Sequence, residues 1–349
     1  MKRFAWLALT LLSACGSPAA TNPVPSPSPS ASATPSPSPL ATASATTIPL
    51  GRWASAMAYD DERHNVILFG GMAGQAPLGD TWTWNGVAWS HRQGLTVNPS
   101  ARQGGAMAFD EVNRQVVLFG GLAANGQMND TWVWNGNAWQ LQHPGHSPPA
   151  REGSSMAFHQ AIHSIVLYGG MNQSTPKPSA INDTWAWNGN DWSQLQPAAS
   201  PAGGVRPRLA ALNAANLVAR FGDCIESHDN ALYTFDGHTW SQRAATGSWP
   251  PALCLPSFAG DFWRGQLVLF GGNRGTGAPG PAETWTYDGT AWQKVTPAQS
   301  PPARYDAPMV FDPDKHRIVL FGGQGLGEGQ SGPLNDTWTW DGTAWTLHQ

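Results

Sequence analysis

The stretch LFGGLAANGQMNDTWVWNGNAW, from Leu118 to Trp139, contains a glycine pair, an Asp-Thr-Trp triplet and an Asn-Gly dipeptide. Its first four residues recur along the chain as LFGG, LYGG or a degenerate RFGD. The other copies begin at Leu68, Leu167, Arg220, Leu269 and Leu320. A regular step of about fifty residues is typical of repeat architectures. Six repeats therefore fill the chain from about Leu50 to Gln349.

Each repeat is expected to form four short strands. In the second repeat they are residues 104–110, 115–121, 130–136 and 138–142. Alternating polarity and many β-branched or aromatic side chains favour strands, and no helical period persists. An Asn-Gly or Asp-Gly pair separates the third and fourth strands of every repeat, where a tight turn needs positive φ.

The glycine pair after an apolar strand, the aromatic third strand and a tryptophan seven residues after its first aromatic residue resemble the kelch repeat. The resemblance extends over residues 50–349 and is closest to exported bacterial kelch proteins of the DTWxWDGxxW type. Kelch repeats fold as propeller blades, so it implies an all-β, six-bladed kelch-type β-propeller with four antiparallel strands per blade. Blades should coincide with repeats, and the ring should close by packing of blade six against blade one.

The N-terminus is expected to be a targeting segment. In residues 1–14, Lys2 and Arg3 precede a short apolar run, as in a secretory signal peptide. The sequence LSAC, ending at Cys15, resembles the bacterial lipobox, which implies lipidation of Cys15 and a membrane-anchored lipoprotein at the cell envelope. A plain secretory signal is the alternative.

Residues 15–47 consist largely of Ser, Pro, Ala and Thr, which predicts a disordered stalk, and the propeller is expected over residues 48–349. The formal net charge is −4 and basic residues are scattered, so nucleic acid is not expected as a partner. We expect a monomer that contacts the membrane through the lipid anchor alone.

Charged residues recur at two positions of the repeat. Arginines open the first strand at Arg52, Arg102, Arg151, Arg208 and Arg304. Acids precede the third strand at Asp80, Asp130, Asp183, Glu283 and Asp336. Repeat four has Ala231 in place of the acid, and repeat five has Leu253 in place of the arginine. Pairing each acid with the arginine of the next blade leaves no charge unpaired, whereas pairing within a blade would leave Arg208 and Glu283 without partners. We therefore predict a ring of bidentate inter-blade bridges.

The same junction carries two cysteines. Cys224 follows the second strand of repeat four, and Cys254 begins the first strand of repeat five. These two ends lie on one edge of an antiparallel sheet, and an exported protein can be oxidised, so a disulfide is predicted. Two separate buried thiols are the alternative.

Pairs of tryptophans two residues apart occupy one side of the third strand. They are Trp82 and Trp84, Trp132 and Trp134, Trp185 and Trp187, and Trp338 and Trp340. Tryptophan can stack on sugars, but neighbouring blades cover both faces of each sheet in a propeller. We therefore place these side chains in the inter-blade core.

Catalytic motifs are sparse. The kelch propeller of galactose oxidase holds a copper-radical site, but most tyrosines here align with packing positions, with Tyr305 the exception. The histidines are dispersed, and the close pair His143 and His146 has no nearby carboxylate. No nucleophile elbow, zinc helix or phosphate loop is present. No metal or other cofactor is expected, and an oxidase or other carbohydrate-active enzyme is the alternative function.

The loops between the second and third strands, and between the fourth and first, share one face and vary in length. Variable loops on a rigid scaffold are typical of recognition surfaces, although plain solvated connections are the alternative. The candidate contact residues are His91, Arg92, His143, His146, Arg274 and Glu328. The sequence thus predicts a lipid-anchored binding module for an envelope protein or glycan.

Overall fold

The computed structural model describes residues 48–173, 179–212, 215–222, 230–244, 247–275, 280–327 and 330–348. The chain divides into two compact units, residues 1–44 and 45–349, and every described residue belongs to the second. The predicted signal peptide, Cys15 and the stalk lie outside the described residues. Within the described ranges, no helix is long and apolar enough to cross a membrane.

Six antiparallel sheets, each with four main strands from one repeat, dominate the described part of the second unit. Sheet 1 contains β1 (Ala56–Asp60), β2 (Asn65–Phe69), β5 (Thr81–Trp84) and β6 (Trp89–His91). Sheet 2 contains β8 (Ala106–Asp110), β9 (Gln115–Ala123), β10 (Gly126–Trp134) and β11 (Trp139–Gln142). Sheet 3 contains β12 (Ser155–His159), β13 (Ser164–Tyr168), β16 (Thr184–Trp187) and β17 (Trp192–Leu195).

The second half of the chain repeats the pattern. Sheet 4 contains β18 (Arg208–Leu212), β19 (Leu217–Phe221), β20 (Leu232–Phe235) and β21 (Trp240–Gln242). Sheet 5 contains β22 (Ser257–Asp261), β23 (Gln266–Phe270), β24 (Thr284–Tyr287) and β25 (Trp292–Val295). Sheet 6 contains β27 (Met309–Asp312), β28 (Arg317–Phe321), β31 (Thr337–Trp340) and β32 (Trp345–His348).

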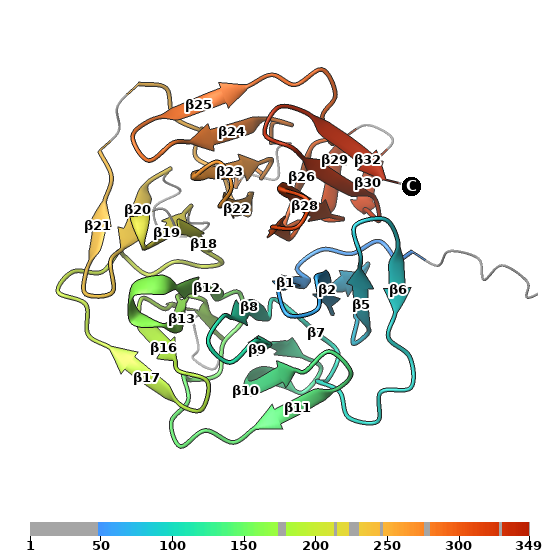
Figure 1. Ribbon diagram of the computed structural model, residues 1–349, viewed down its shortest axis with the longest axis vertical. Helices are drawn as coiled ribbons and strands as arrows, with labels where there is room; N and C mark the ends of the chain where they lie inside the picture. The colour runs from blue at the N-terminus through green and yellow to red at the C-terminus, as the bar shows by residue number, and fades with distance from the viewer. Residues whose placement is uncertain are drawn as a thin grey trace, which may run out of the picture. The chain divides into compact units, whose positions relative to one another are not determined.

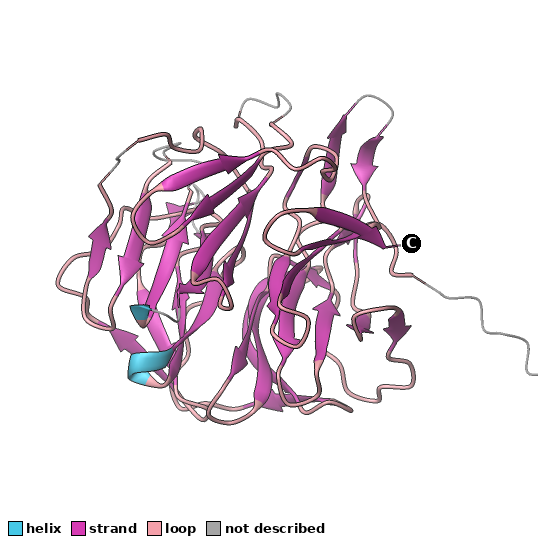
Figure 2. Cartoon of the chain, turned by 45° about the horizontal axis from the view of Figure 1, so that its top comes forward, coloured by secondary structure: helices cyan, strands magenta, loops and turns pink. Residues whose placement is uncertain are grey.

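The loops contain additional short strands and a 3-10 turn. They are β3 (Met72–Ala73) with β4 (Ala76–Pro77), β14 (Met171–Asn172) with β15 (Ser179–Ala180), β26 (Arg304–Tyr305) with β29 (Gln324–Gly327) and β30 (Gln330–Pro333), β7 (Arg102–Gln103) on β9, and the 3-10 turn η1 (Gln160–Ile162). Figure 2 shows how small the helical content is.

The sheets are arranged around a common axis in a propeller-like way (Figure 1). In each, the first strand is innermost and the strands follow in chain order. Adjacent inner strands contact one another in the order β1, β8, β12, β18, β22 and β27, and β27 contacts β1. The strands predicted for the second repeat are confirmed, with the second and third extended toward their shared loop.

The Asn-Gly and Asp-Gly turns form as predicted and also serve as packing sites. Gly136 has a φ of 94°, and the Asn135 side chain accepts hydrogen bonds from the next turn residues. A Cβ at Gly136 would lie 1.8 Å from Nε of Arg63, in the first turn of sheet 1. The first turn of sheet 1 therefore covers the turn glycine of sheet 2.

The paired tryptophans are buried as predicted and pack between adjacent sheets. In five of the six sheets, the tryptophan at the start of the fourth strand donates its indole N–H to a threonine of the preceding sheet. These pairs are Trp89–Thr337, Trp139–Thr81, Trp192–Thr131, Trp240–Thr184 and Trp345–Thr284, at 2.8–3.0 Å. The first of them joins sheet 6 to sheet 1, where Val319 and Phe321 also pack against Trp82 and Trp89.

The predicted inter-blade ion pairs are wrong. Four arginines bind the acid of their own repeat with both carboxylate oxygens: Arg52 with Asp80, Arg102 with Asp130, Arg151 with Asp183, and Arg304 with Asp336. The predicted partners Asp80–Arg102, Asp130–Arg151, Asp183–Arg208, Glu283–Arg304 and Asp336–Arg52 are therefore not the pairs observed. Glu283 instead binds Lys294 at 2.5 Å, and Arg208 binds Asp306.

The path of the main chain explains this correction. Arg102 donates its backbone N–H to Leu78 O and accepts from Gly71 N–H, both in the preceding repeat. Its side chain points the other way, to Gly120 O at 3.0 Å and to Asp130. The arginine thus does link two sheets, but its main chain makes one connection and its ion pair makes the other.

Repeat four departs from this scheme. Gly204 makes the backbone contacts that the arginines make elsewhere, accepting from Gly170 N–H and donating to Ile181 O. Arg208 lies four residues later, at the start of β18, and corresponds to Ala56 of sheet 1. The sequence alignment of Arg208 with Arg52 was therefore wrong. Cys224 lies outside the described residues, so the disulfide with the buried Cys254 remains a prediction.

Candidate functional site: the axial cavity and its mouth

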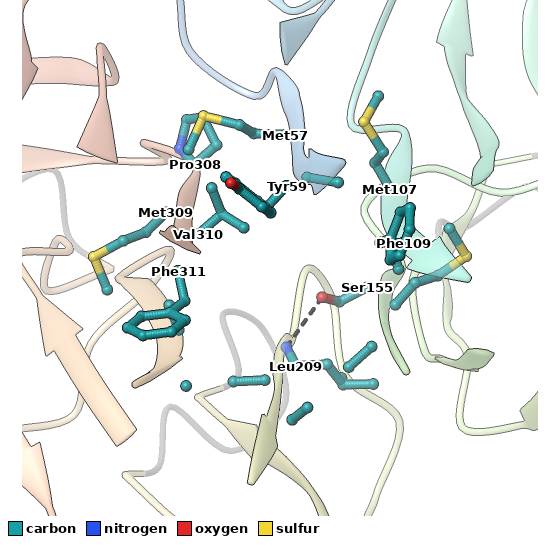
Figure 3. A pocket seen from close by; sticks show the side chains of 18 of the residues that line it. Met57, Tyr59, Met107, Phe109, Ser155, Leu209, Pro308, Met309, Val310 and Phe311 are labelled. Carbon is teal, nitrogen blue, oxygen red and sulfur yellow. Dashed lines mark hydrogen bonds between the residues drawn. The ribbon is translucent and has the colours of Figure 1, made fainter. Parts of the chain in front are cut away.

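A cavity of about 370 Å³ lies among the first strands of all six sheets (Figure 3). One layer of its lining comes from equivalent positions of the six strands: Met57, Met107, Met156, Leu209, Phe258 and Met309. Alanines and other small residues follow at the next position, and they leave the interior open. The cavity wall is therefore largely apolar.

Aromatic side chains line one end of this cavity. Tyr59, Phe109, Phe158 and Phe311 occupy the same strand position in four sheets. Burial, assisted by the Asp312 carboxylate, raises the pKa of Tyr59 well above its ordinary value. The phenol therefore stays protonated at physiological pH.

The other end, which we call the axial mouth, is defined by a recurring left-handed residue. Ala54, Gly104, Gly153, Arg206, Leu255 and Asp306 have φ between 52° and 65°. This conformation is uncommon for residues other than glycine and is often found at ligand-binding sites. The chain turns here from the connecting loop into the first strand, which brings these residues to the rim.

A compact charged group occupies the mouth. Arg206 binds Asp306 at 2.9 Å and Glu152 at 3.3 Å, and Arg208 also binds Asp306. Both carboxylates are almost fully buried. The Arg206 guanidinium also lies over the ring of Trp53, 5.9 Å from its centroid. Two positive and two negative charges cancel within the group, so the mouth is polar but carries no net charge from these four residues.

Several polar atoms beside this group are buried without a hydrogen-bond partner among the described residues. They are Oγ of Ser55, Oγ of Ser154, Oε1 of Gln103 and Nε of Arg208. Ser55, Ser154 and Arg208 line a small hollow in the mouth together with Arg206 and Asp306. An unsatisfied buried polar group costs about 1–3 kcal/mol, so a bound polar molecule or ordered water would stabilise this arrangement.

The predicted contact residues that the structure describes do not line the cavity or the mouth. Arg92 donates to Gly136 O at 2.9 Å and lies over the Trp134 ring, so it helps to join sheets 1 and 2. His146 binds Asp191 at 2.8 Å, and His91 stacks on Trp82. The side chains of His143 and Arg274 are exposed, and Glu328 lies outside the described residues.

Sequence reasoning missed the residues of the mouth. Arg206 and Asp306 stand where other repeats have alanine, glycine or leucine, which is a detectable departure from the pattern. Recognising it requires placing Gly204, rather than Arg208, at the arginine position. Tyr305 precedes this mouth position in repeat six, and burial together with the Asp306 carboxylate raises its pKa.

A metal centre finds no support in the part of the chain that the structure describes. No three His, Cys, Asp or Glu side chains there are grouped so that they could hold a metal ion. The geometry of the mouth instead suits hydrogen bonding to hydroxyl, amide or similar neutral polar groups, because both donors and acceptors are unpaired.

Comparisons with known proteins agree with this architecture. The family model described as the KLHDC2/KLHL20/DRC7 Kelch-repeats domain matches residues 41–222 and 80–272. The solved structure entitled "Structure of YjhT" is similar with a TM-score of 0.65 and 14% identity, covering 86% of this chain and 99% of that chain. At this identity, the likeness concerns the fold alone. No curated protein matches the chain.

Proposed function

Because the chain belongs to the kelch-repeat family, we propose that its six sheets are the blades of one kelch β-propeller that serves as a binding module. In this proposal the protein is exported and anchored through a lipid on Cys15, and residues 15–47 form the stalk that holds the propeller at the bacterial cell envelope. The signal-like N-terminus, the LSAC sequence and the Ser/Pro-rich composition support these assignments.

The observation that carries the binding role is the set of unpaired polar atoms at the axial mouth. Two hydroxyl oxygens, one amide oxygen and the Nε atom of Arg208 are buried there without partners among the described residues, beside an open cavity. A protein loop or a glycan would both supply the missing donors and acceptors. The mouth therefore replaces the dispersed loop residues as the proposed centre of recognition.

The hydroxyls of Ser55 and Ser154 can be removed without breaking a hydrogen bond among the described residues, and the test uses this. In the full-length protein, solubilised in detergent, Ser55→Ala with Ser154→Ala removes two groups that make no hydrogen bond among the described residues. Stability should be unchanged or slightly higher, because no internal bond is lost. Capture of the binding partner from an envelope extract should fall roughly 5- to 150-fold, as expected for two hydrogen bonds of about 0.5–1.5 kcal/mol each.

A matched control is available in Ser257, whose buried hydroxyl donates to Ala307 O at 2.8 Å. Ser257→Ala should lower the melting temperature while leaving capture at the wild-type level. Equal capture by all variants would refute the role of the mouth. The material that the wild type captures and the double serine variant does not identifies the partner as a protein or a glycan. Turnover of a captured glycan would favour the enzymatic alternative.

A further inference from the structure

A buried arginine occupies a leucine position in sheet 4. Arg220 of β19 pairs with Tyr233 of β20, and the equivalent residues of the other sheets are Leu68, Leu118, Leu167, Leu269 and Leu320. Only 2% of Arg220 is exposed. Its side chain makes no ion pair or hydrogen bond with the side chain or backbone of any described residue, and its Nε is buried without a partner. Its guanidinium lies near the rings of Tyr168 and Tyr233, at 5.9 and 5.3 Å.

The surroundings of Arg220 correspond to a recurring site that has lost its carboxylate. In sheets 1, 2, 3 and 6, a buried guanidinium binds both oxygens of an aspartate. In sheet 4 the arginine position is Gly204 and the acid position is Ala231. A Cβ at Gly204 would lie 2.9 Å from Nη2 of Arg220, so Arg220 fills the space that the recurring arginine side chain enters.

The energetics of this replacement are unfavourable without a counterion. Burying an unpaired charge is costly, and contact with two aromatic rings offsets that cost only in part. In the four intact sites, the aspartate side chain keeps 16–25% of its surface exposed. The carboxylate position of this recurring site is therefore one that solvent reaches.

The described residues supply no carboxylate to Arg220, and we propose that an external carboxylate binds it and takes the place of the aspartate missing at position 231. A planar guanidinium matches a carboxylate with two parallel hydrogen bonds, as the four intact sites show. The ligand is a small carboxylic acid or the acidic side chain of a bound partner. This inference does not depend on the function proposed for the axial mouth.

The experiment measures the melting temperature of the full chain in sodium acetate and in sodium chloride, at equal pH and ionic strength. Acetate should raise the melting temperature of the wild type by a few degrees relative to chloride. Arg220→Leu, which installs the residue of the other five sheets, should remove this difference. Ala231→Asp should also remove it and should raise the melting temperature in chloride, because the chain then supplies its own carboxylate.

Sheet 3 offers a matched control. Asp183→Ala leaves Arg151 without its bidentate partner, so this variant should be less stable and should gain a new acetate-dependent increase in melting temperature. A larger response of the wild type to a short glutamate-containing peptide than to acetate would assign the carboxylate to a partner protein. Equal melting of the wild type in acetate and chloride would overturn the proposal, as would an acetate effect that survives in Ala231→Asp.

Discussion

Breaking one ion pair within a sheet should destabilise the protein strongly, and Asp130→Ala is the informative change. Asp130 accepts two hydrogen bonds from Arg102, at 2.6 and 2.8 Å, and one from the Trp132 indole at 2.7 Å. The Arg102 side chain is 1% exposed. Removing the carboxylate therefore leaves a guanidinium buried with only carbonyl and hydroxyl acceptors.

The size of the effect follows from this burial. Removing one partner of a buried ion pair costs about 3–5 kcal/mol, a large fraction of the 5–15 kcal/mol that stabilises a typical domain. Arg102→Met also loses the ion pair, but it removes the buried guanidinium itself and therefore leaves no unpaired positive charge in the interior. Once Arg102 is gone, Asp130→Ala should cost much less, so the double-mutant cycle should give a coupling of about 2–3 kcal/mol.

Urea unfolding followed by tryptophan fluorescence measures both variants and their combination. A second cycle, between Asp130 and Arg151 of the next repeat, is the control, because Arg151 binds Asp183 instead. Its coupling should stay near 0.5 kcal/mol or below. A coupling between Asp130 and Arg151 that equals or exceeds the Arg102–Asp130 value would refute pairing within the sheet and restore the inter-blade scheme.

Other predictions concern the remaining links. Thr81→Val removes the buried acceptor of a tryptophan in sheet 2 and should lower the free energy of unfolding by about 1–3 kcal/mol, whereas Thr83→Val, on the same strand, should change it little. The hydrogen bonds from Arg52 and Trp82 outweigh burial and hold the pKa of Asp80 below its ordinary value. The contribution of Asp80 to stability is therefore complete above about pH 4 and is lost as the pH falls through the depressed pKa. Between about pH 2 and pH 5, the melting temperature of Asp80→Asn should depend less on pH than that of the wild type. Gly136→Ala should destabilise more than Gly289→Ala in urea titrations, because both have φ near 95° but no described atom crowds Gly289.

Much of the fold could be predicted because its determinants are local. The Asn-Gly turn of Asn135 and Gly136 forms in the predicted place, and the alternation in residues 115–121 sets which side chains face the neighbouring sheets. Burial of the paired tryptophans followed from the same reasoning. Each of these features depends on residues that are close together in one repeat.

The ion pairs could not be predicted by counting partners. Pairing within a blade was expected to leave Arg208 and Glu283 without partners, because only the recurring arginines and acids were considered. Lys294 lies across the sheet from Glu283, and Asp306 reaches Arg208 from repeat six, so both charges are compensated. The Arg208–Asp306 contact joins residues 98 positions apart, which no local pattern reveals.

The axial mouth was missed for the same physical reason. Its hydroxyls and charges come from distant repeats and meet because the first strands surround one axis. Ser55 and Ser154 look like ordinary small residues in the sequence. Their importance depends on burial without partners, which is a property of the assembled sheets.

The two interfaces of sheet 4 differ from the repeat pattern in opposite ways: one has lost polar residues, and the other has gained a charged residue. On the side facing sheet 5, Leu232 replaces the recurring threonine and Leu253 the recurring arginine, and both pack in one apolar cluster with Trp292. Simple loss of polar contacts accounts for that side. It does not account for Arg220, where a leucine position in the opposite interface has gained a charge. The carboxylate that we propose explains why the charge is tolerated, because it would restore the ion pair that four of the other sheets make internally.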